Sequence, residues 1–411
     1  MYITWLIVDG EETDNRDNFL RHSKTHSNMS TVNLFKPIKI GATQLQNRVV
    51  MAPLTRTRAQ KNIPSDLAVE YYKQRGSSPG TLLISEATYI HPSSGGGGFG
   101  AETVPGIWND SAIVAGWKKV IDGVHSEGSK MYIQLWDIGR VADYEILSKN
   151  GYDLTGPSAI AQAGDEEGAK HVRALTIPEI KQKVQRYVDA AKAALEAGAD
   201  GVEVHSANGY LPDQFIHWNS NHRTDEYGGS IENRARFTLE IIDAVSAAIG
   251  ADRVGVRFSP WTTFQDMEVS EEKTLPQFKY LFEQLEKRGV EDASKRLSYI
   301  HVIEPRANGI FDMTPEPWQS NEPFRKIWTG NLIRAGGFNR QLAIDTAQED
   351  DKTLIAFGRR FIANPDLVYR LEKDLPLTKW DRDTFYVPGP KGYTDYPFYK
   401  DQLEQDQELK Q

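Results

Sequence analysis

Residues 176–206 have the sequence TIPEIKQKVQRYVDAAKAALEAGADGVEVHS, a helical pattern followed by a short strand pattern. Apolar residues recur at helical spacing from residue 178 to residue 197, which predicts an amphipathic helix with one buried face. Thr176 and Glu179 form a capping box at its start, and Gly198 predicts its end. A helix that leads directly into such a strand is the repeating unit of an α/β fold.

The same alternation of strand and helix recurs along the chain. Eight short apolar or β-branched runs predict strands over residues 48–55, 81–87, 130–136, 201–206, 253–259, 298–304, 332–336 and 354–358. Several of these runs are apolar throughout, as expected of strands that are buried on both faces. No linker divides the series, and such a series closes most simply into a parallel barrel. The predicted fold class is therefore α/β, a single (β/α)8 TIM barrel.

Segments outside this series predict additions to the barrel. Residues 34–40 and 44–47 flank Gly41 and Ala42, which predicts a hairpin at the lower end of the barrel. A stretch rich in tyrosine and proline, residues 375–399, predicts a lid or edge segment. The predicted division is a flexible extension over residues 1–28, the barrel over residues 29–400 and a solvated tail over residues 401–411.

The composition excludes several classes of function. The formal net charge of -9 would repel nucleic acids and anionic membrane surfaces, so neither is an expected partner. The chain has no cysteine, which excludes disulfides, thiolate metal sites and cysteine nucleophiles, and any redox chemistry must use a bound cofactor. The apolar run at residues 3–8 is too short for a membrane span and makes a poor signal peptide. The expected location is cytoplasmic.

Glycines end the last two predicted strands. Gly336 and Gly337 end the seventh, and Gly358 ends the eighth and is followed by Arg359. Barrel enzymes commonly hold a phosphate at this place with backbone N–H groups and a guanidinium. The pattern therefore predicts a phosphorylated ligand.

Polar side chains also end the middle strands, where barrel enzymes place their catalytic groups. Gln134 and Arg257 could bond the polar edge of a large ring, and the arginine would favour negative charge that develops there. A reduced flavin fits this description. The fourth strand ends in the polar run His205 to Tyr210.

Four motifs together resemble the old yellow enzyme family. They are MAPLTR at residues 51–56, HSANGYL at 205–211, YGGS with ENR at 227–234, and FIANPDL at 361–367. Each motif alone is weak, whereas the four in this order are specific, and the resemblance extends over residues 33–399. It implies an FMN-dependent enzyme, a monomer or homodimer, that uses NADPH or NADH to reduce activated C=C bonds of small enone-type or nitro substrates.

The resemblance also implies roles for individual residues. His205 and Asn208 would bind the substrate oxygen, where negative charge grows during hydride transfer, and Tyr210 would be the proton donor. The residues implied to hold tightly bound, non-covalent FMN are Pro53, Leu54, Thr55, Ala87, Gln134, Arg257, Gly336, Gly337, Gly358 and Arg359. The residues implied to shape the substrate pocket are Trp136, Phe264, Phe311 and Tyr386.

Two patterns suggest other sites and are better explained otherwise. Residues 95–100, GGGGFG, satisfy the dinucleotide-binding motif G-x-G-x-x-G, but Pro105 and Gly106 follow where a helix should begin, which indicates a loop. His217 and His222 lie near His205 in the sequence, but their spacing does not match a metal motif, and no metal is expected.

Other functions remain open from the sequence. A phosphosugar lyase or isomerase would also explain a phosphate site, but it usually needs a lysine at a strand end for a Schiff base, and the predicted strand ends offer none. A flavin-dependent isomerase of a biosynthetic pathway would not need the acid at Tyr210. The same holds for a non-catalytic flavin carrier. The retained tyrosine favours net reduction.

Overall fold

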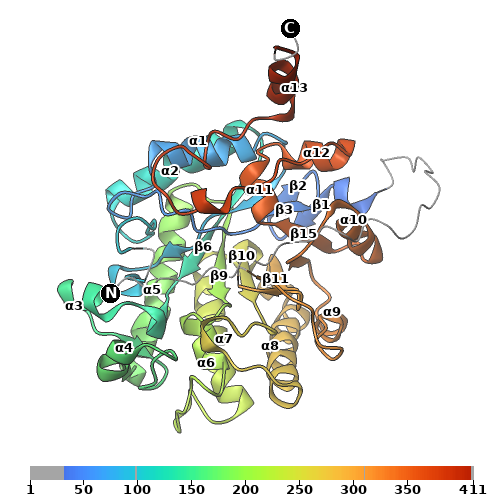
Figure 1. Cartoon of the computed structure of the whole chain (residues 1–411). Coiled ribbons are helices and arrows are strands. Elements are labelled where there is room, and N and C mark those ends of the chain that lie inside the picture. Colours follow the sequence, from blue (N-terminus) through green and yellow to red (C-terminus); the bar gives the residue numbers. More distant parts are fainter. Residues whose placement is uncertain (1–31, 98–99, 310, 409–411) are drawn as a thin grey trace.

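Eight parallel strands form a closed barrel at the centre of the molecule (Figure 1). The computed structural model describes residues 32–97, 100–309 and 311–408. The barrel strands are β3 (Val49–Met51), β4 (Leu82–Ile84), β6 (Lys130–Trp136), β9 (Gly201–Ser206), β10 (Val254–Phe258), β11 (Tyr299–Ile303), β14 (Leu332–Ala335) and β15 (Thr353–Phe357). Each pairs in parallel with the next, and β15 pairs with β3 to close the ring. The predicted TIM barrel and its eight strands are confirmed.

The first two barrel strands are shorter than predicted. β3 was expected to reach residue 55, but Pro53 has no N–H to donate, and the last donor of the run is Ala52, whose N lies 3.0 Å from Phe357 O. β4 ends at Ile84, and the chain then bends at Glu86. The carbonyl of Glu86 accepts hydrogen bonds from the hydroxyls of Ser85 and Thr88, each at 2.8 Å. The short strand β5 (Thr88–Tyr89) then runs beside the end of β6.

Helices surround the barrel and bury their apolar faces against it (Figure 1). The longer ones are α1 (Asp66–Arg75), α2 (Ser111–Ser126), α5 (Ile177–Glu196), α7 (Ile231–Ile249), α8 (Glu271–Glu291) and α10 (Arg340–Glu349). The shorter ones are α3 (Tyr144–Lys149), α4 (Glu166–His171), α6 (Leu211–Ile216), α9 (Glu322–Ile327), α11 (Arg359–Ala363) and α12 (Leu367–Lys373). Among the described residues, none of the helices has the length and hydrophobicity needed to cross a membrane.

The helix predicted from the opening stretch is α5. Its capping box is present: Glu179 N lies 3.4 Å from Thr176 Oγ1, and Thr176 N lies 2.8 Å from Glu179 Oε2. Gly198, with φ of +99°, turns the chain out of the helix, as predicted. Three residues later the chain enters β9, so this helix end fixes where β9 begins.

A hairpin closes the lower end of the barrel, as predicted. Its antiparallel strands β1 (Ile38–Ile40) and β2 (Thr43–Leu45) bury apolar side chains against the barrel interior. Inside, the rings of Tyr132 and Tyr299 lie 5.6 Å apart. Gly255 faces the Tyr299 ring, where an added Cβ would lie 2.4 Å from ring atoms. The lower half of the barrel is therefore filled, and a ligand site must lie at the other end.

Small two-stranded sheets decorate the loops. β7 (Thr155–Gly156) pairs with β8 (Arg173–Ala174), and β12 (Ala307–Asn308) pairs with β13 (Phe311–Asp312). The glycine-rich loop follows a 3-10 turn at Pro92–Ser94, and Gly95 packs on the Tyr89 ring, where a Cβ would lie 2.6 Å from Cε2. No helix opens in its described part, residues 95–97 and 100, which agrees with the predicted loop; Gly98 and Phe99 lie outside the described residues.

The C-terminal segment is strapped to the barrel by buried arginines. Arg56 Nη2 donates to Gly392 O at 2.7 Å, and Arg58 donates to four carbonyls between residues 384 and 391. Arg75 of α1 donates to Tyr393 O at 3.1 Å, and the Tyr393 ring stacks on Tyr71 at 4.1 Å. The stretch predicted as a lid or edge segment is therefore a fixed part of the described fold.

The two predicted terminal boundaries have different outcomes. The boundary after residue 400 falls inside helix α13 (Tyr399–Glu408), which projects from the body in Figure 1. The start of this helix is held where Tyr399 N donates to Asp366 Oδ2 at 2.7 Å. The extension predicted over residues 1–28 lies outside the described residues.

We expect Arg75→Met to lower the free energy of unfolding by about 3 kcal/mol, because it leaves buried carbonyls without their charged donor. The side chain is almost fully buried and also donates to Phe361 O and Tyr71 O, both at 3.0 Å. Urea denaturation followed by circular dichroism measures the change. Lys118→Met, which removes an exposed ion pair to Asp122, is the control and should cost less than about 1 kcal/mol. Equal effects of the two changes would show that the hydrogen bonds of Arg75 do not stabilise the fold.

Candidate active site

A layer of polar side chains crosses the barrel interior above the tyrosines. In the strand register, Gln134 of β6 lies beside Glu203 of β9. Arg257 of β10 lies between His205 of β9 and His301 of β11. Alternate residues of a barrel strand face inward, so the register brings these five side chains together. The sequence placed three of them, Gln134, His205 and Arg257, in a site and missed Glu203 and His301.

Glu203 is the centre of this layer. Its Oε1 accepts a hydrogen bond from Gln134 Nε2 at 2.7 Å, and its Oε2 lies 2.9 Å from His301 Nδ1. Burial acts to raise the pKa of Glu203, but His301, Arg257 and Gln134 outweigh it and hold the pKa below its usual range. Glu203 is therefore an ionised carboxylate with no exposed surface.

An aromatic cluster lies at the carboxyl ends of β6 and β9. The ring of Tyr210 packs edge-on against Trp136 at 4.8 Å and against His205 at 5.1 Å, measured between ring centroids. Trp136 stacks on Tyr89 at 5.0 Å. Trp136, His205 and Tyr210, which the sequence predicted as site residues, therefore lie together.

Burial sets the protonation states of this cluster. It lowers the pKa of His205 well below its usual value, with further lowering by Arg257 and His301, so the imidazole is neutral at neutral pH. Burial raises the pKa of Tyr210, an effect that a hydrogen bond from Gln265 opposes only in part. The site therefore contains a neutral imidazole beside a protonated phenol.

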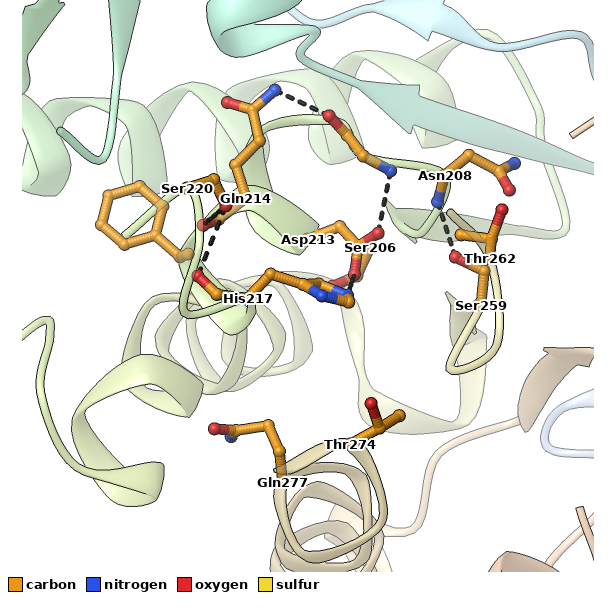
Figure 2. Close-up of polar contacts among 12 residues, drawn as sticks. Ser206, Asn208, Asp213, Gln214, His217, Ser220, Ser259, Thr262, Thr274 and Gln277 are labelled. Carbon is orange, nitrogen blue, oxygen red and sulfur yellow. Dashed lines mark hydrogen bonds and ion pairs between the residues drawn. The ribbon is translucent and has the colours of Figure 1, made fainter. Parts of the chain in front are cut away.

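The turn that carries Asn208 and Tyr210 is held by side-chain hydrogen bonds, which Figure 2 shows around Asn208. Asn208 has φ of +58°, and its N donates to Ser259 Oγ at 2.7 Å. Gly209 N donates to Asp213 Oδ2 and Gly209 O accepts from Gln214 Nε2, both at 2.8 Å. The turn is thus held by side chains of α6 and of the loop after β10, in a conformation that is uncommon for a residue other than glycine.

Several buried polar atoms near the strand ends have no hydrogen-bond partner among the described residues. They are Arg257 Nε, Trp136 Nε1, His205 Nδ1 and Asn208 Oδ1. Buried polar atoms are nearly always paired, so a cluster of unpaired ones fits a site that a polar ligand completes. The site suits FMN, because the Arg257 guanidinium and the neighbouring Gln134 amide match the polar edge of its ring.

The loops after β3 and β4 supply the more apolar part of the predicted FMN site. Pro53, Leu54 and Thr55 are half-buried and Ala87 is buried. Gly358, at the end of β15, lies close to this loop, since a Cβ there would be 3.2 Å from Leu54 Cδ2. The residues predicted from the first and eighth strands are therefore neighbours.

The predicted phosphate site contains one arginine that the sequence analysis did not single out. Gly336 and Gly337 have φ of +117° and +62°, and Arg306 Nε donates to Gly336 O at 2.8 Å. Arg359 donates to both carboxylate oxygens of Asp312, at 2.6 and 2.8 Å, and its guanidinium lies 5.0 Å from the Trp380 ring. Arg359 thus has an acidic partner with which a phosphate would have to compete.

The residues predicted to shape the substrate pocket differ in exposure. Trp136 is buried, Phe264 is half-buried, and Tyr386 is 41% exposed while still influencing the pKa of Tyr210. Phe311 is 61% exposed on β13. Of the four, Trp136 is therefore the most enclosed and Phe311 the most exposed.

The alternative chemistries, a Schiff-base lysine and a metal site, would use lysine or histidine side chains. Lys183 approaches the end of β6, but it is buried in an ion pair with Asp137, 2.7 Å from Oδ2. His217 pairs with Asp213, and within the described ranges neither it nor His222 belongs to a cluster of three or more metal-binding side chains. A hollow of about 650 Å³ around residues 157–160, 174–177 and 222–225 contains none of the predicted site residues.

We expect the stability of the protein to fall as the pH drops from 7 to 5, in part because of His205. Its pKa is far below the unfolded value of about 6.5, so the unfolded chain binds a proton there that the folded chain does not. This one group accounts for a loss of about 2 kcal/mol over that range. In urea denaturation at both pH values, His205→Gln should lose that much less than the wild type. Equal losses would show that folding does not lower the pKa of His205.

Comparison with known proteins supports the resemblance found in the sequence. The model of the NADH:flavin oxidoreductase / NADH oxidase family matches residues 33–378. Enoate reductase 1 of Kluyveromyces lactis is 46% identical over 389 residues, covering 91% of this chain and 96% of that protein.

Solved structures of the same type are also similar. The old yellow enzyme of a Pichia species is 42% identical with a TM-score of 0.82, covering 90% of this chain and 94% of that one. A morphinone reductase in complex with tetrahydroNAD is 39% identical with a TM-score of 0.79, covering 89% and 97%. The family predicted from the four motifs is confirmed. The chain belongs to the NADH:flavin oxidoreductase / NADH oxidase family and is an oxidoreductase of the old yellow enzyme type.

Proposed function

We propose that the protein is an FMN-dependent ene-reductase, which uses NADPH or NADH to reduce the C=C bond of α,β-unsaturated carbonyl or nitro compounds. The observation that carries the proposal is the joint placement of His205, Asn208 and Tyr210 beside the Gln134–Arg257 layer. The names of the relatives agree, since one is an enoate reductase and one structure contains a nicotinamide analogue.

FMN is proposed to lie across the carboxyl ends of the strands, bound tightly but without a covalent bond. Gln134 and Arg257 would bond the polar edge of the ring, and residues 53–55 with Ala87 would contact its other parts. The phosphate would lie at Gly336, Gly337, Gly358 and Arg359. When bound, FMN supplies the hydride that is passed from the nicotinamide cofactor to the substrate carbon.

His205 and Asn208 are proposed to hold the oxygen of the substrate. As a hydride reaches the β-carbon, negative charge grows on that oxygen, and preplaced N–H donors stabilise it. A neutral imidazole can donate from one nitrogen, and an amide can donate from its NH2 group. Each donor is worth roughly 3 kcal/mol of transition-state stabilisation in comparable sites. The braced turn keeps Asn208 in place without a cost at the moment of reaction.

Tyr210 is proposed to give its hydroxyl proton to the α-carbon. Its raised pKa keeps the phenol protonated throughout the neutral range, as a general acid requires. The edge-on packing against Trp136 and His205 restricts its ring. An isomerase or a non-catalytic carrier would have no use for an acid held in this way, so the geometry favours net reduction.

The first experiment measures NADPH oxidation by FMN-loaded protein with 2-cyclohexenone or N-ethylmaleimide. We expect either compound to accelerate oxidation and to be recovered with its C=C bond reduced, as seen by mass spectrometry. The chain has no cysteine, so loss of N-ethylmaleimide cannot come from thiol alkylation. Protein that binds FMN and oxidises NADPH but leaves both compounds intact would rule out the ene-reductase.

We expect Tyr210→Phe to separate the two half-reactions. The change removes only a hydroxyl, so FMN binding and reduction of the loaded protein by NADPH should stay near the wild-type level. The step that consumes the enone should slow by roughly a hundredfold, because the α-carbon lacks its acid. Stopped-flow absorbance resolves both steps, with Tyr89→Phe as a matched control in the same cluster. Equal slowing of both half-reactions would remove Tyr210 from the role of proton donor.

A further inference from the structure

We infer that Glu203 and His301 are a positioning pair beneath the proposed FMN site: they orient the amide of Gln134 and lower the redox potential of the bound ring. The inference rests on the proposed function, because it concerns the same cofactor. Neither residue is among those that the sequence or the family resemblance indicated.

The first step is the orientation of Gln134. A carboxylate can only accept hydrogen bonds, so the group that Gln134 directs at Glu203 Oε1, 2.7 Å away, must be its NH2 group. The amide carbonyl is then left to face another partner. The edge of an FMN ring has an N–H group from which such an oxygen can accept a hydrogen bond. By binding the NH2 group, Glu203 thus orients Gln134 as an acceptor toward the ligand.

The second step is what His301 does. It is fully buried, and its Nδ1 donates to Glu203 Oε2 at 2.9 Å, because the carboxylate cannot donate. Its other nitrogen, Nε2, has no hydrogen-bond partner among the described residues. His301 therefore binds the second carboxylate oxygen and leaves the first to Gln134. The one hydrogen bond of the His301 side chain among the described residues is thus the one to Glu203.

The third step is the charge balance. Arg257 lies beside His301 and His205 in the register, and it is the cation of this layer that Glu203 partly compensates. Reduction of a flavin adds negative charge to the ring, which Arg257 favours and a buried carboxylate opposes. In the low-dielectric interior, an ionised Glu203 should therefore make the bound FMN harder to reduce. A side chain that only filled the barrel would not have this effect.

The test is the midpoint potential of bound FMN, measured by spectroelectrochemistry on FMN-loaded protein. Glu203→Gln keeps the size and an acceptor oxygen but removes the charge, and we expect its potential to shift to more positive values than that of the wild type. The matched control is Asp200→Asn. Asp200 also pairs with a histidine, His125 Nε2 at 2.8 Å, but lies before the start of β9. Its potential should match the wild type. Equal potentials in Glu203→Gln and Asp200→Asn would overturn the charge effect.

Glu203→Leu tests the orientation of Gln134, because it also removes the acceptor. If this variant retains the wild-type circular dichroism spectrum, its Kd for FMN should exceed that of Glu203→Gln by about tenfold, the factor expected for one misplaced hydrogen bond. A Kd equal to that of Glu203→Gln would overturn the orienting role. If Glu203→Leu fails to fold, Glu203→Met, which also removes the acceptor and is close to glutamate in length, takes its place with the same criterion.

The failure of this inference differs from failure of the proposed function. Wild-type protein that takes up no FMN would overturn both. Wild-type protein that binds FMN and reduces enones, combined with an unchanged potential in Glu203→Gln, would overturn only the inference.

Discussion

A carboxylate buried in the middle of the barrel constrains everything around it. Glu203 has no exposed surface, and an uncompensated charge there would cost several kcal/mol. The fold meets this demand with Gln134 and His301 as hydrogen-bond donors and Arg257 as a cation, each from a different strand. The same groups make the boundary between the tyrosine-filled lower half of the barrel and its upper end. The site is therefore built on a layer whose buried charges must be paired within the barrel.

Rigidity at the upper end comes from the turn after β9. Asn208 adopts a left-handed conformation that costs free energy, and the turn persists because Ser259, Asp213 and Gln214 fix its backbone (Figure 2). All three partners are buried, so water cannot replace them easily. The proposed donor Asn208 and the proposed acid Tyr210 are thus held before any ligand arrives. This is the condition under which N–H groups stabilise developing charge most effectively.

The sequence predicted the parts of the fold that depend on local pattern. Helical spacing and the capping box located α5, and apolar runs located all eight strands. Glu203 and His301 escaped because a polar residue within an apolar run has no meaning until the strand register supplies its neighbours. A signal was present for Glu203, which lies two residues before His205 on β9 and so faces the same side of the strand. The arginine strap was missed for a related reason. Its partners are backbone carbonyls 326 to 336 residues away in the sequence, which leave no trace in the pattern of side chains.

The strap and the site are mechanically connected through the loop after β3. Thr57 Oγ1 donates to Tyr386 O at 2.9 Å, which holds Tyr386, a proposed pocket residue. Arg56 N donates to Glu86 Oε2 at 3.0 Å. Glu86 immediately precedes Ala87 of the proposed FMN site, and burial raises its pKa to about 7 although Arg56 lowers it. The backbone of one short loop thus joins the C-terminal segment to the end of β4. Through this loop, the C-terminal segment therefore supports the wall of the proposed site.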